Sequence, residues 1–237
     1  MNSPLLCLFL TLACLSPVWA QPHVQAVTFA AEPGVIYAPL LDAAKQLHLD
    51  VTRDKEGRCV QLENLVLQPG ALRQLIDGTE LVRAADLPLA HPGITLTTED
   101  SITVLRRGFY RMSLSVGPKQ VEVNLATQQL QAWQGDRLVL QTHISSGRNG
   151  RTPQGSFTAG PFRARMHYSH LFNNAPMPWS VQIHGHVFIH GFTSVPDYPA
   201  SHGCIRLPLD GGNPARFFYE WVDNGTPVRV VAGAVHP

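Results

Sequence analysis

Short stretches in which apolar and polar residues alternate, separated by turn residues, dominate the second half of this chain. Residues 121–125, 129–133 and 137–144 follow the pattern, and Gln-Gly-Asp at 134–136 separates the last two. Alternation with a period of two is typical of strands that bury one face. The same reasoning predicts further strands at 156–159, 185–189 and 227–231. Many short strands with few helices favour a mainly β fold, barrel-like or sandwich-like.

One helix is expected among these strands. Asn213 is a good N-cap residue, and Pro214 suits the first helical turn. Residues 215–222 carry the predicted helix, and Asn224-Gly225 ends it.

Residues 21–117 repeat one order of elements twice, which predicts a separate small α+β domain. A strand near 34–40, a helix at 41–47 and strands at 49–52 and 59–62 form the first unit. The second unit begins about 44 residues later with the same order of strand, short helix and hairpin. This order resembles the stalk-like domains at the N-termini of copper amine oxidases, which implies a targeting or spacer role. Cys59 alternates with Gln61 on a predicted strand, which indicates a buried thiol.

The first twenty residues carry no charge and contain an apolar run at 5–15. This pattern, followed by Val18-Trp19-Ala20, predicts a signal peptide cut after Ala20. A retained membrane anchor and a lipoprotein modified at Cys14 are the alternatives. We therefore expect an exported chain, in which Cys59 and Cys204 are the remaining thiols.

Composition excludes several classes of protein. Charged residues make up 15% of the chain, and the net charge is +1. A disordered charged tail needs a higher charge density, and a nucleic-acid-binding protein needs a basic excess. Eight of the 11 histidines lie after residue 117. Histidine titrates near neutrality, so the chemistry is expected in the second half.

The row Ser201-His202-Gly203-Cys204 is a candidate nucleophile segment. A thiol nucleophile needs a base within hydrogen-bond reach and backbone N–H groups aimed at the developing oxyanion. His190 ends a predicted strand fourteen positions before Cys204, and the Pro-bearing loop between them can fold back. We therefore hypothesise a Cys–His dyad. Asp197, Asp210 and a backbone carbonyl remain open as the group that orients the imidazole.

These residues resemble the signature of the YkuD-type L,D-transpeptidases. His190-Gly191 and the row Ser201-His202-Gly203-Cys204-Ile205-Arg206 carry the likeness, and Thr-Pro-Gln-Gly-Ser-Phe at 152–157 extends it upstream. The resemblance implies a β-rich catalytic domain over 118–232, with Cys204 as the acylated nucleophile and His190 as the general base. It implies oxyanion donors at Gly203 and Cys204, with His202 adjoining. The remaining candidates for substrate contact are Arg206, Ser201, Gly191, His184 and His186.

The resemblance also implies a reaction and its location. Peptidoglycan tetrapeptide stems are cut after their third residue, D-Ala leaves, and the acyl group passes from Cys204 to an amine of another stem or of a protein lysine. An L,D-carboxypeptidase, in which water accepts the acyl group, is the alternative. No metal or cofactor is required. We expect a monomer in the periplasm or cell envelope, with no nucleic acid as partner.

Two other classes of function stay open on the sequence alone. A zinc-dependent hydrolase would use His184, His186 and His190, which share one strand parity, with His202 and Cys204 close behind. A non-catalytic cell-wall-binding protein would hold a stem peptide in the same cleft.

Several residues near this region have roles that the sequence does not decide. Residues 175–179 are interpreted as either a lid over the cleft or a surface loop. Three histidines are expected at the surface: His143, His167 and His170. Four arginines are interpreted as either attracting acidic stem peptides or being ordinary solvated side chains: Arg148, Arg151, Arg163 and Arg165.

Overall fold

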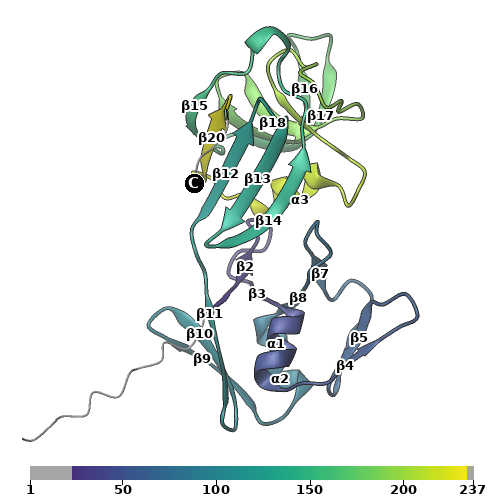
Figure 1. Cartoon of the computed structure of the whole chain (residues 1–237), viewed down its shortest axis with the longest axis vertical. Helices are drawn as coiled ribbons and strands as arrows, with labels where there is room; N and C mark the ends of the chain where they lie inside the picture. The colour runs from purple at the N-terminus through teal and green to yellow at the C-terminus, as the bar shows by residue number, and fades with distance from the viewer. Residues whose placement is uncertain (1–22, 234–237) are drawn as a thin grey trace, which may run out of the picture.

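The computed structural model describes residues 23–233, which fold mainly into strands (Figure 1). The predicted signal peptide, with Cys14, lies outside the described residues. The elements of the first part are β1 (Val24–Gln25), β2 (Val27–Thr28), β3 (Ile36–Pro39), α1 (Leu40–Leu47), β4 (Val51–Arg53), β5 (Cys59–Leu62), β6 (Leu65–Val66), β7 (Arg73–Gln74), β8 (Glu80–Arg83), the 3₁₀ helix η1 (Ala84–Asp86), α2 (Leu87–Ala90), β9 (Ile94–Glu99), β10 (Ile102–Arg107) and β11 (Tyr110–Ser115).

The repeated order of strand, helix and hairpin is present in this first part. β3, α1, β4 and β5 form the first unit, and β8, α2, β9 and β10 form the second. The opening strands of the two units pair with each other, because β3 lies antiparallel to β8. The apolar face of α1 covers this pair, with Leu40, Ala43 and Leu47 buried. Residues 24–115 therefore combine short helices and small sheets in the predicted order.

The second part contains the strands expected from alternation. Its elements are β12 (Lys119–Asn124), β13 (Gln129–Gln134), β14 (Arg137–His143), the 3₁₀ helix η2 (Arg148–Gly150), β15 (Gly155–Thr158), β16 (Arg163–Ser169), β17 (Ala175–His184), β18 (Val187–Gly191), β19 (Ile205–Leu207), α3 (Pro214–Trp221) and β20 (Pro227–Val231). The Asn213 side chain accepts a hydrogen bond from the Arg216 N–H, so Asn213 is the N-cap of α3 as predicted.

Two sheets and one helix enclose the core of the second part (Figure 1). One sheet has five strands in the order β14-β13-β12-β20-β15, and the other has four in the order β16-β17-β18-β19. Val123 of the first sheet and Ile189 and Ile205 of the second are fully buried in one hydrophobic cluster. Phe218 and Trp221 of α3 belong to the same cluster. The mainly β fold with two facing sheets is therefore confirmed.

Both interpretations of residues 175–179 assumed a loop, but this segment is a strand. It is the first half of β17, which pairs antiparallel with β16 from Arg163↔Val181 to Ser169↔Ala175. Pro176 and Pro178 obscured this strand, because proline lacks the N–H that a strand ladder uses.

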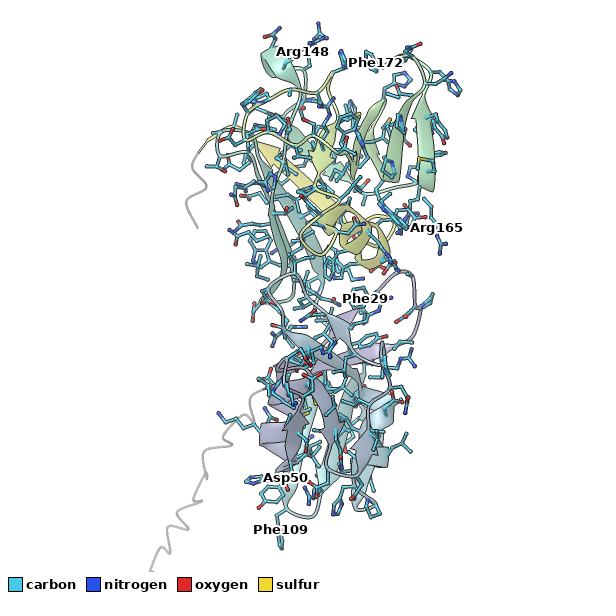
Figure 2. All side chains as sticks on the ribbon, turned by 90° about the vertical axis from the view of Figure 1, so that its right-hand side faces the viewer. Phe29, Asp50, Phe109, Arg148, Arg165 and Phe172 are labelled. Atoms are coloured by element: carbon cyan, nitrogen blue, oxygen red, sulfur yellow. The ribbon has the colours of Figure 1, made fainter. Side chains whose placement is uncertain are left out.

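The first part of the chain reaches into the core of the second part. Val27, Phe29 and Tyr37 belong to the hydrophobic cluster that contains α3. The ring of Phe29 packs edge-on against Phe217 of α3, with centroids 5.7 Å apart. Figure 2 shows Phe29 where the two parts meet. The hydrophobic core therefore crosses the boundary that we predicted between 117 and 118.

A fully buried amide adds polar contacts to this junction. The Gln134 Oε1 accepts hydrogen bonds from the Thr28 N–H at 3.0 Å and from the Trp221 Nε1–H at 3.3 Å. Its Nε2 donates to the Thr28 hydroxyl at 2.8 Å. One side chain of β13 therefore ties β2 to α3.

No helix within residues 23–233 has the length and apolar character needed to cross a membrane.

Candidate active site

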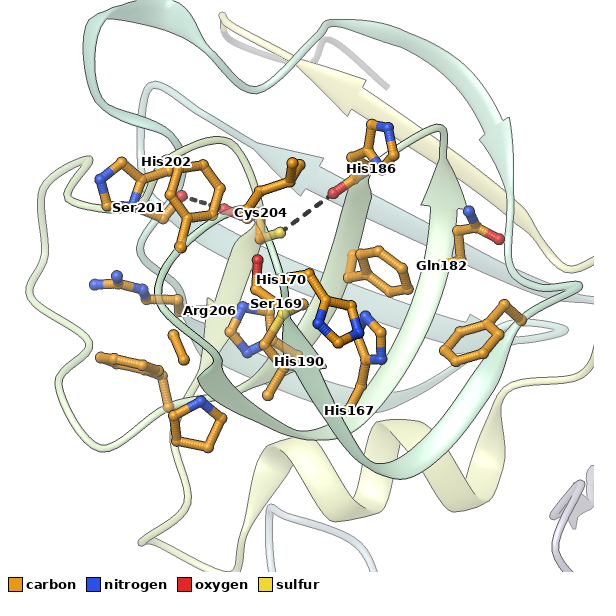
Figure 3. Close-up of a pocket in the computed structure, with 18 of the residues that line it drawn as sticks. His167, Ser169, His170, Gln182, His186, His190, Ser201, His202, Cys204 and Arg206 are labelled. Carbon is orange, nitrogen blue, oxygen red and sulfur yellow. Dashed lines mark hydrogen bonds between the residues drawn. The ribbon is translucent and has the colours of Figure 1, made fainter.

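A cavity of about 470 Å³, here called the Cys204 cavity, is walled by the four-stranded sheet β16-β17-β18-β19 (Figure 3). Its lining includes His167 of β16, Met177 of β17, His190 of β18 and Cys204, which directly precedes β19. Side chains from four neighbouring segments therefore face one space. The volume lies in the usual range for a small-molecule or peptide site.

The register of two parallel strands brings the predicted dyad to this cavity. β18 and β19 pair as Ile189↔Ile205 and His190↔Arg206. Successive side chains of a strand point to opposite faces of the sheet. Ile189 and Ile205 are buried in the core, so His190 and Cys204 face the opposite side, where both line the cavity. The two proposed reacting groups are diagonal neighbours on one sheet face, as Figure 3 shows.

His190 is only 4% exposed, and a backbone carbonyl fixes its ring. The Nδ1 atom lies 2.8 Å from the Gly191 carbonyl oxygen. A carbonyl can only accept, so Nδ1 carries the proton and Nε2 keeps a free lone pair. The pKa of His190 is lowered to about 4, mainly by burial; the hydrogen bond to Gly191 opposes this shift, and the charge of Arg206 contributes to it. The imidazole is therefore neutral at pH 7, with Nε2 ready to take a proton.

The thiol of Cys204 is half-buried and also neutral at pH 7. Its Sγ lies 3.6 Å from the His186 carbonyl oxygen, to which it donates (Figure 3). Burial raises the pKa of Cys204, while a backbone hydrogen bond from Phe188 and the charge of Arg206 oppose the rise. Cys204 and Cys59 are both free thiols. The resting site therefore holds a thiol beside a neutral base, not a preformed thiolate–imidazolium pair.

Hydrogen bonds within the turn at 201–204 fix the backbone beside the thiol. The Ser201 hydroxyl accepts from the Gly203 N–H at 3.0 Å and donates to the Cys204 carbonyl at 2.6 Å. Gly203 is buried at a φ of 145°, a conformation that favours glycine. Neither the His202 N–H nor the Cys204 N–H has an acceptor within residues 23–233. The Cys204 N–H is therefore a free backbone donor of this turn, next to the thiol.

Positive charge surrounds the same turn. The Arg206 guanidinium lies over the Phe192 ring, 4.0 Å from its centroid. Desolvation and the charges of Arg148, Arg151 and Arg206 lower the pKa of His202. Within the described part of the chain, none of these three arginines has a carboxylate at salt-bridge distance. The turn therefore presents uncompensated positive charge to an acidic ligand.

The second part of the chain is similar to a known protein family. Residues 118–230 match the family model described as YkuD, the L,D-transpeptidase catalytic domain. These residues form an L,D-transpeptidase catalytic domain. No curated protein matches the chain. The likeness of residues 21–117 to amine oxidase stalk domains stays a prediction.

Solved structures of L,D-transpeptidases are similar to this chain at low identity. The protein from Xylanimonas cellulosilytica DSM 15894 is 31% identical, the match covers 49% of this chain and 62% of that chain, and the TM-score is 0.42. The protein from Stackebrandtia nassauensis is 24% identical, with 50% and 58% covered and a TM-score of 0.44. This chain therefore spans less than two thirds of either protein. An L,D-transpeptidase from Mycobacterium tuberculosis H37Rv is 15% identical over 90% of this chain and 96% of that chain, with a TM-score of 0.43.

Three of the predicted contact residues of the transpeptidase domain do not offer a polar group to the cavity. The Ser201 hydroxyl is used within the turn. Gly191 is buried, and a Cβ atom added there would lie 2.4 Å from the Leu209 Cδ2. His184 packs against Phe157, with ring centroids 5.0 Å apart, and does not line the cavity. Gly203 was expected as an oxyanion donor, but its N–H is bonded to Ser201.

The zinc hypothesis assumed that three histidines share one strand, and this assumption is wrong. β17 ends at His184, Gly185 and His186 form the hairpin turn, and β18 carries His190. The shared parity therefore breaks at the turn. Residues 23–233 contain no group of three or more His, Cys, Asp or Glu side chains that could hold a metal ion.

Pairing of β16 with β17 adds cavity residues that sequence reasoning missed. His143 and His170 are exposed as predicted, whereas His167 is half-buried, and both His167 and His170 line the Cys204 cavity. Phe172, between β16 and β17, stacks on His202 with ring centroids 4.2 Å apart. The signal available was the pair of histidines three residues apart, but only the long hairpin carries them to the nucleophile.

The four arginines that the sequence suggested for the cleft differ in their surroundings. Arg163 donates to the carbonyls of Val222 and Tyr219, so it holds the end of α3. Arg165 is exposed on β16. Arg148 and Arg151 lie near enough to His202 to lower its pKa. In Figure 2, Arg148 and Phe172 lie together at one end of the molecule.

Proposed function

We propose that this protein is a cysteine L,D-transpeptidase that transfers acyl groups between peptidoglycan stem peptides. The observation that carries the proposal is the pairing of a free thiol, Cys204, with a neutral imidazole, His190, on one face of the cavity wall. A nucleophile and base within reach, with an ordered third group behind the base, is the general pattern of covalent acyl transfer. Here the third group is the Gly191 carbonyl.

In the proposed acylation step these two residues act together. The Cys204 Sγ attacks the carbonyl carbon after the third stem residue, while its proton passes to His190 Nε2. The carbonyl oxygen becomes an oxyanion, which the Cys204 N–H can bind. The C–N bond then breaks, and His190 returns the proton to the nitrogen of the leaving D-Ala. The product is a thioester on Cys204.

The second step uses the same two residues. An acceptor amine attacks the thioester carbon, the C–S bond breaks, and His190 transfers the amine proton to the departing sulfur. Arg148, Arg151 and Arg206 support a substrate that carries several carboxylates, because their charges are uncompensated. Stem peptides carry several carboxylates, and they lie outside the cytoplasm. The cell envelope is therefore the proposed site of action.

Intact-protein mass spectrometry after mixing with a disaccharide-tetrapeptide tests the proposal. The expected result is an acyl adduct on Cys204, loss of D-Ala and, with an acceptor peptide, a cross-linked product. Cys204→Ala is expected to abolish all three signals while leaving the circular dichroism spectrum unchanged. Loss of D-Ala without a cross-link would replace the proposal with an L,D-carboxypeptidase. An adduct formed by Cys204→Ala would overturn the thiol mechanism.

A further inference from the structure

We propose that Thr152 is a positioning residue, whose hydroxyl orients the Gly203–Cys204 peptide unit so that the Cys204 N–H can bind the oxyanion. This inference rests on the proposed acyl transfer at Cys204. Thr152 lies in the loop between η2 and β15, more than fifty positions before the nucleophile, and is 3% exposed.

Two hydrogen bonds fix the Thr152 hydroxyl. Its Oγ1 accepts from the Gly147 N–H at 2.7 Å and lies 2.8 Å from the Gly203 carbonyl oxygen. The Gly147 N–H can only donate, and the Gly203 carbonyl can only accept. The single hydroxyl proton must therefore point at the Gly203 oxygen. The hydroxyl holds that carbonyl in one direction.

The planar peptide bond transmits this direction to the nucleophile. The carbonyl of Gly203 and the N–H of Cys204 belong to one peptide unit, which is trans, since the one cis bond within residues 23–233 is Gly160–Pro161. In a trans unit the C=O and N–H bonds point in opposite directions. Because Thr152 binds the Gly203 oxygen, the Cys204 N–H points away from the loop of Thr152. It has no acceptor in the described part of the chain, so it is available to a substrate oxygen.

The backbone around this peptide unit is held from both sides. The Ser201 hydroxyl binds the Gly203 N–H and the Cys204 carbonyl, which are the groups flanking the unit. On the other side, a Cβ at Gly147 would lie 2.8 Å from the Gly203 Cα. The segment that begins at Gly147 and the nucleophile turn are therefore in close backbone contact, and the Arg148 N–H donates to the Ser201 carbonyl at 3.0 Å. Thr152 supplies the hydrogen bond that sets the rotation of the Gly203–Cys204 peptide plane.

A pair of chemical probes separates oxyanion binding from thiol reactivity. p-Nitrophenyl acetate acylates a thiol through a tetrahedral oxyanion, whereas iodoacetamide alkylates it without one. The ratio of the two rate constants at Cys204 therefore reports the oxyanion donor. Peptide-level mass spectrometry assigns each adduct to Cys204. Neither probe requires the natural substrate, so this ratio tests Thr152 even if stem peptides are not turned over.

The variants are Thr152→Val, which keeps the shape but removes the hydroxyl, and Thr152→Ser, which restores it. Thr158→Val on the exposed face of β15 is the matched control. For Thr152→Val we expect acylation by p-nitrophenyl acetate to fall by about 10- to 100-fold, the scale of a weakened oxyanion donor. Alkylation by iodoacetamide should stay within about twofold, as expected for a thiol whose own environment is unchanged. Thr152→Ser and Thr158→Val should behave like the wild type.

The same variants give a second test with the stem peptide. Thr152→Val should lower kcat for loss of D-Ala and leave KM nearly unchanged, because the oxyanion exists only in the transition state. An unchanged ratio of the two probe rates in Thr152→Val would overturn the inference. An equal loss of both rates would also overturn it, because it would mean general damage to the site. Absence of stem-peptide turnover in the wild type, with the probe ratio still dependent on Thr152, would instead reject the proposed substrate.

Discussion

His190 and Arg206 are direct partners in the parallel pair of β18 and β19, so a permanent positive charge lies opposite the imidazole. Both side chains line the Cys204 cavity. Burial of His190 lowers its pKa most, and the guanidinium, which disfavours a second positive charge, acts in the same direction. Burial and this pairing together keep the proposed base in its neutral, proton-accepting form.

The titration of His190 is the first prediction. The NMR signals of its ring should show a midpoint near the value of about 4 that burial and Arg206 impose on its pKa. Arg206→Gln removes the repelling charge, so the pKa of His190 should rise. Arg165→Gln, at an exposed position of β16, is the control and should leave the midpoint unchanged. A wild-type midpoint near that of a free histidine would contradict the structure.

Stability toward acid gives a second prediction. The unfolded chain binds a proton at His190 below a pH of about 6.5, whereas the folded chain binds it only near its lowered pKa of about 4. The free energy of unfolding should therefore fall as the pH drops between these values, by up to roughly 3 kcal/mol from this group. Denaturant titrations at several pH values measure this loss. His190→Gln should lack this component, and an equal pH dependence in both proteins would refute the assignment.

Alkylation of Cys204 supplies a third prediction. Burial raises the pKa of this thiol, and its neighbouring base is neutral. The rate of iodoacetamide alkylation should therefore increase through the alkaline range, since the thiolate is the reactive form. A preformed thiolate–imidazolium pair would instead give a plateau at neutral pH. Buried Cys59, whose pKa burial also raises, should react only after unfolding and marks the denatured fraction.

Replacement of Gln134 is the fourth prediction. Gln134→Leu leaves the Thr28 N–H and the Trp221 indole N–H without their acceptor in a buried region. We expect the free energy of unfolding to fall by about 3 kcal/mol, since each unsatisfied buried group carries a desolvation penalty. Gln141→Leu, on an exposed position of the same sheet, is the control and should cost far less. Equal stabilities of the two variants would mean that Gln134 does not tie β2 to α3.

The strands with one buried face could be predicted from the sequence. β12 and β13 alternate strictly between core and surface, so their apolar residues recur with the period of a strand. β17 could not be found in this way. It contains Pro176 and Pro178, and its burial does not alternate regularly. Its existence depends on pairing with β16, which is a long-range contact that a local pattern does not encode.

The proposed dyad could be predicted, but the arrangement of the turn beside it could not. Cys204 and His190 are reactive residue types that lie next to glycines, so a single sequence is enough to identify them as candidates. The use of the Ser201 hydroxyl within the turn depends on backbone angles such as the φ of 145° at Gly203. Three histidines were assigned to one strand because a hairpin at Gly185 leaves little mark in the sequence. Spacing identifies reactive residues, whereas the conformation of turns decides which atoms they present.

The position of β20 has a consequence for truncation. β20 lies between β12 and β15, and β15 has no other strand partner within residues 23–233. A variant that ends after α3 therefore has an open sheet, with β15 unpaired. The loop that carries Thr152 leads directly into β15. Such a variant retains its nucleophile but lacks the strand that supports the Thr152 loop, so it should be catalytically silent.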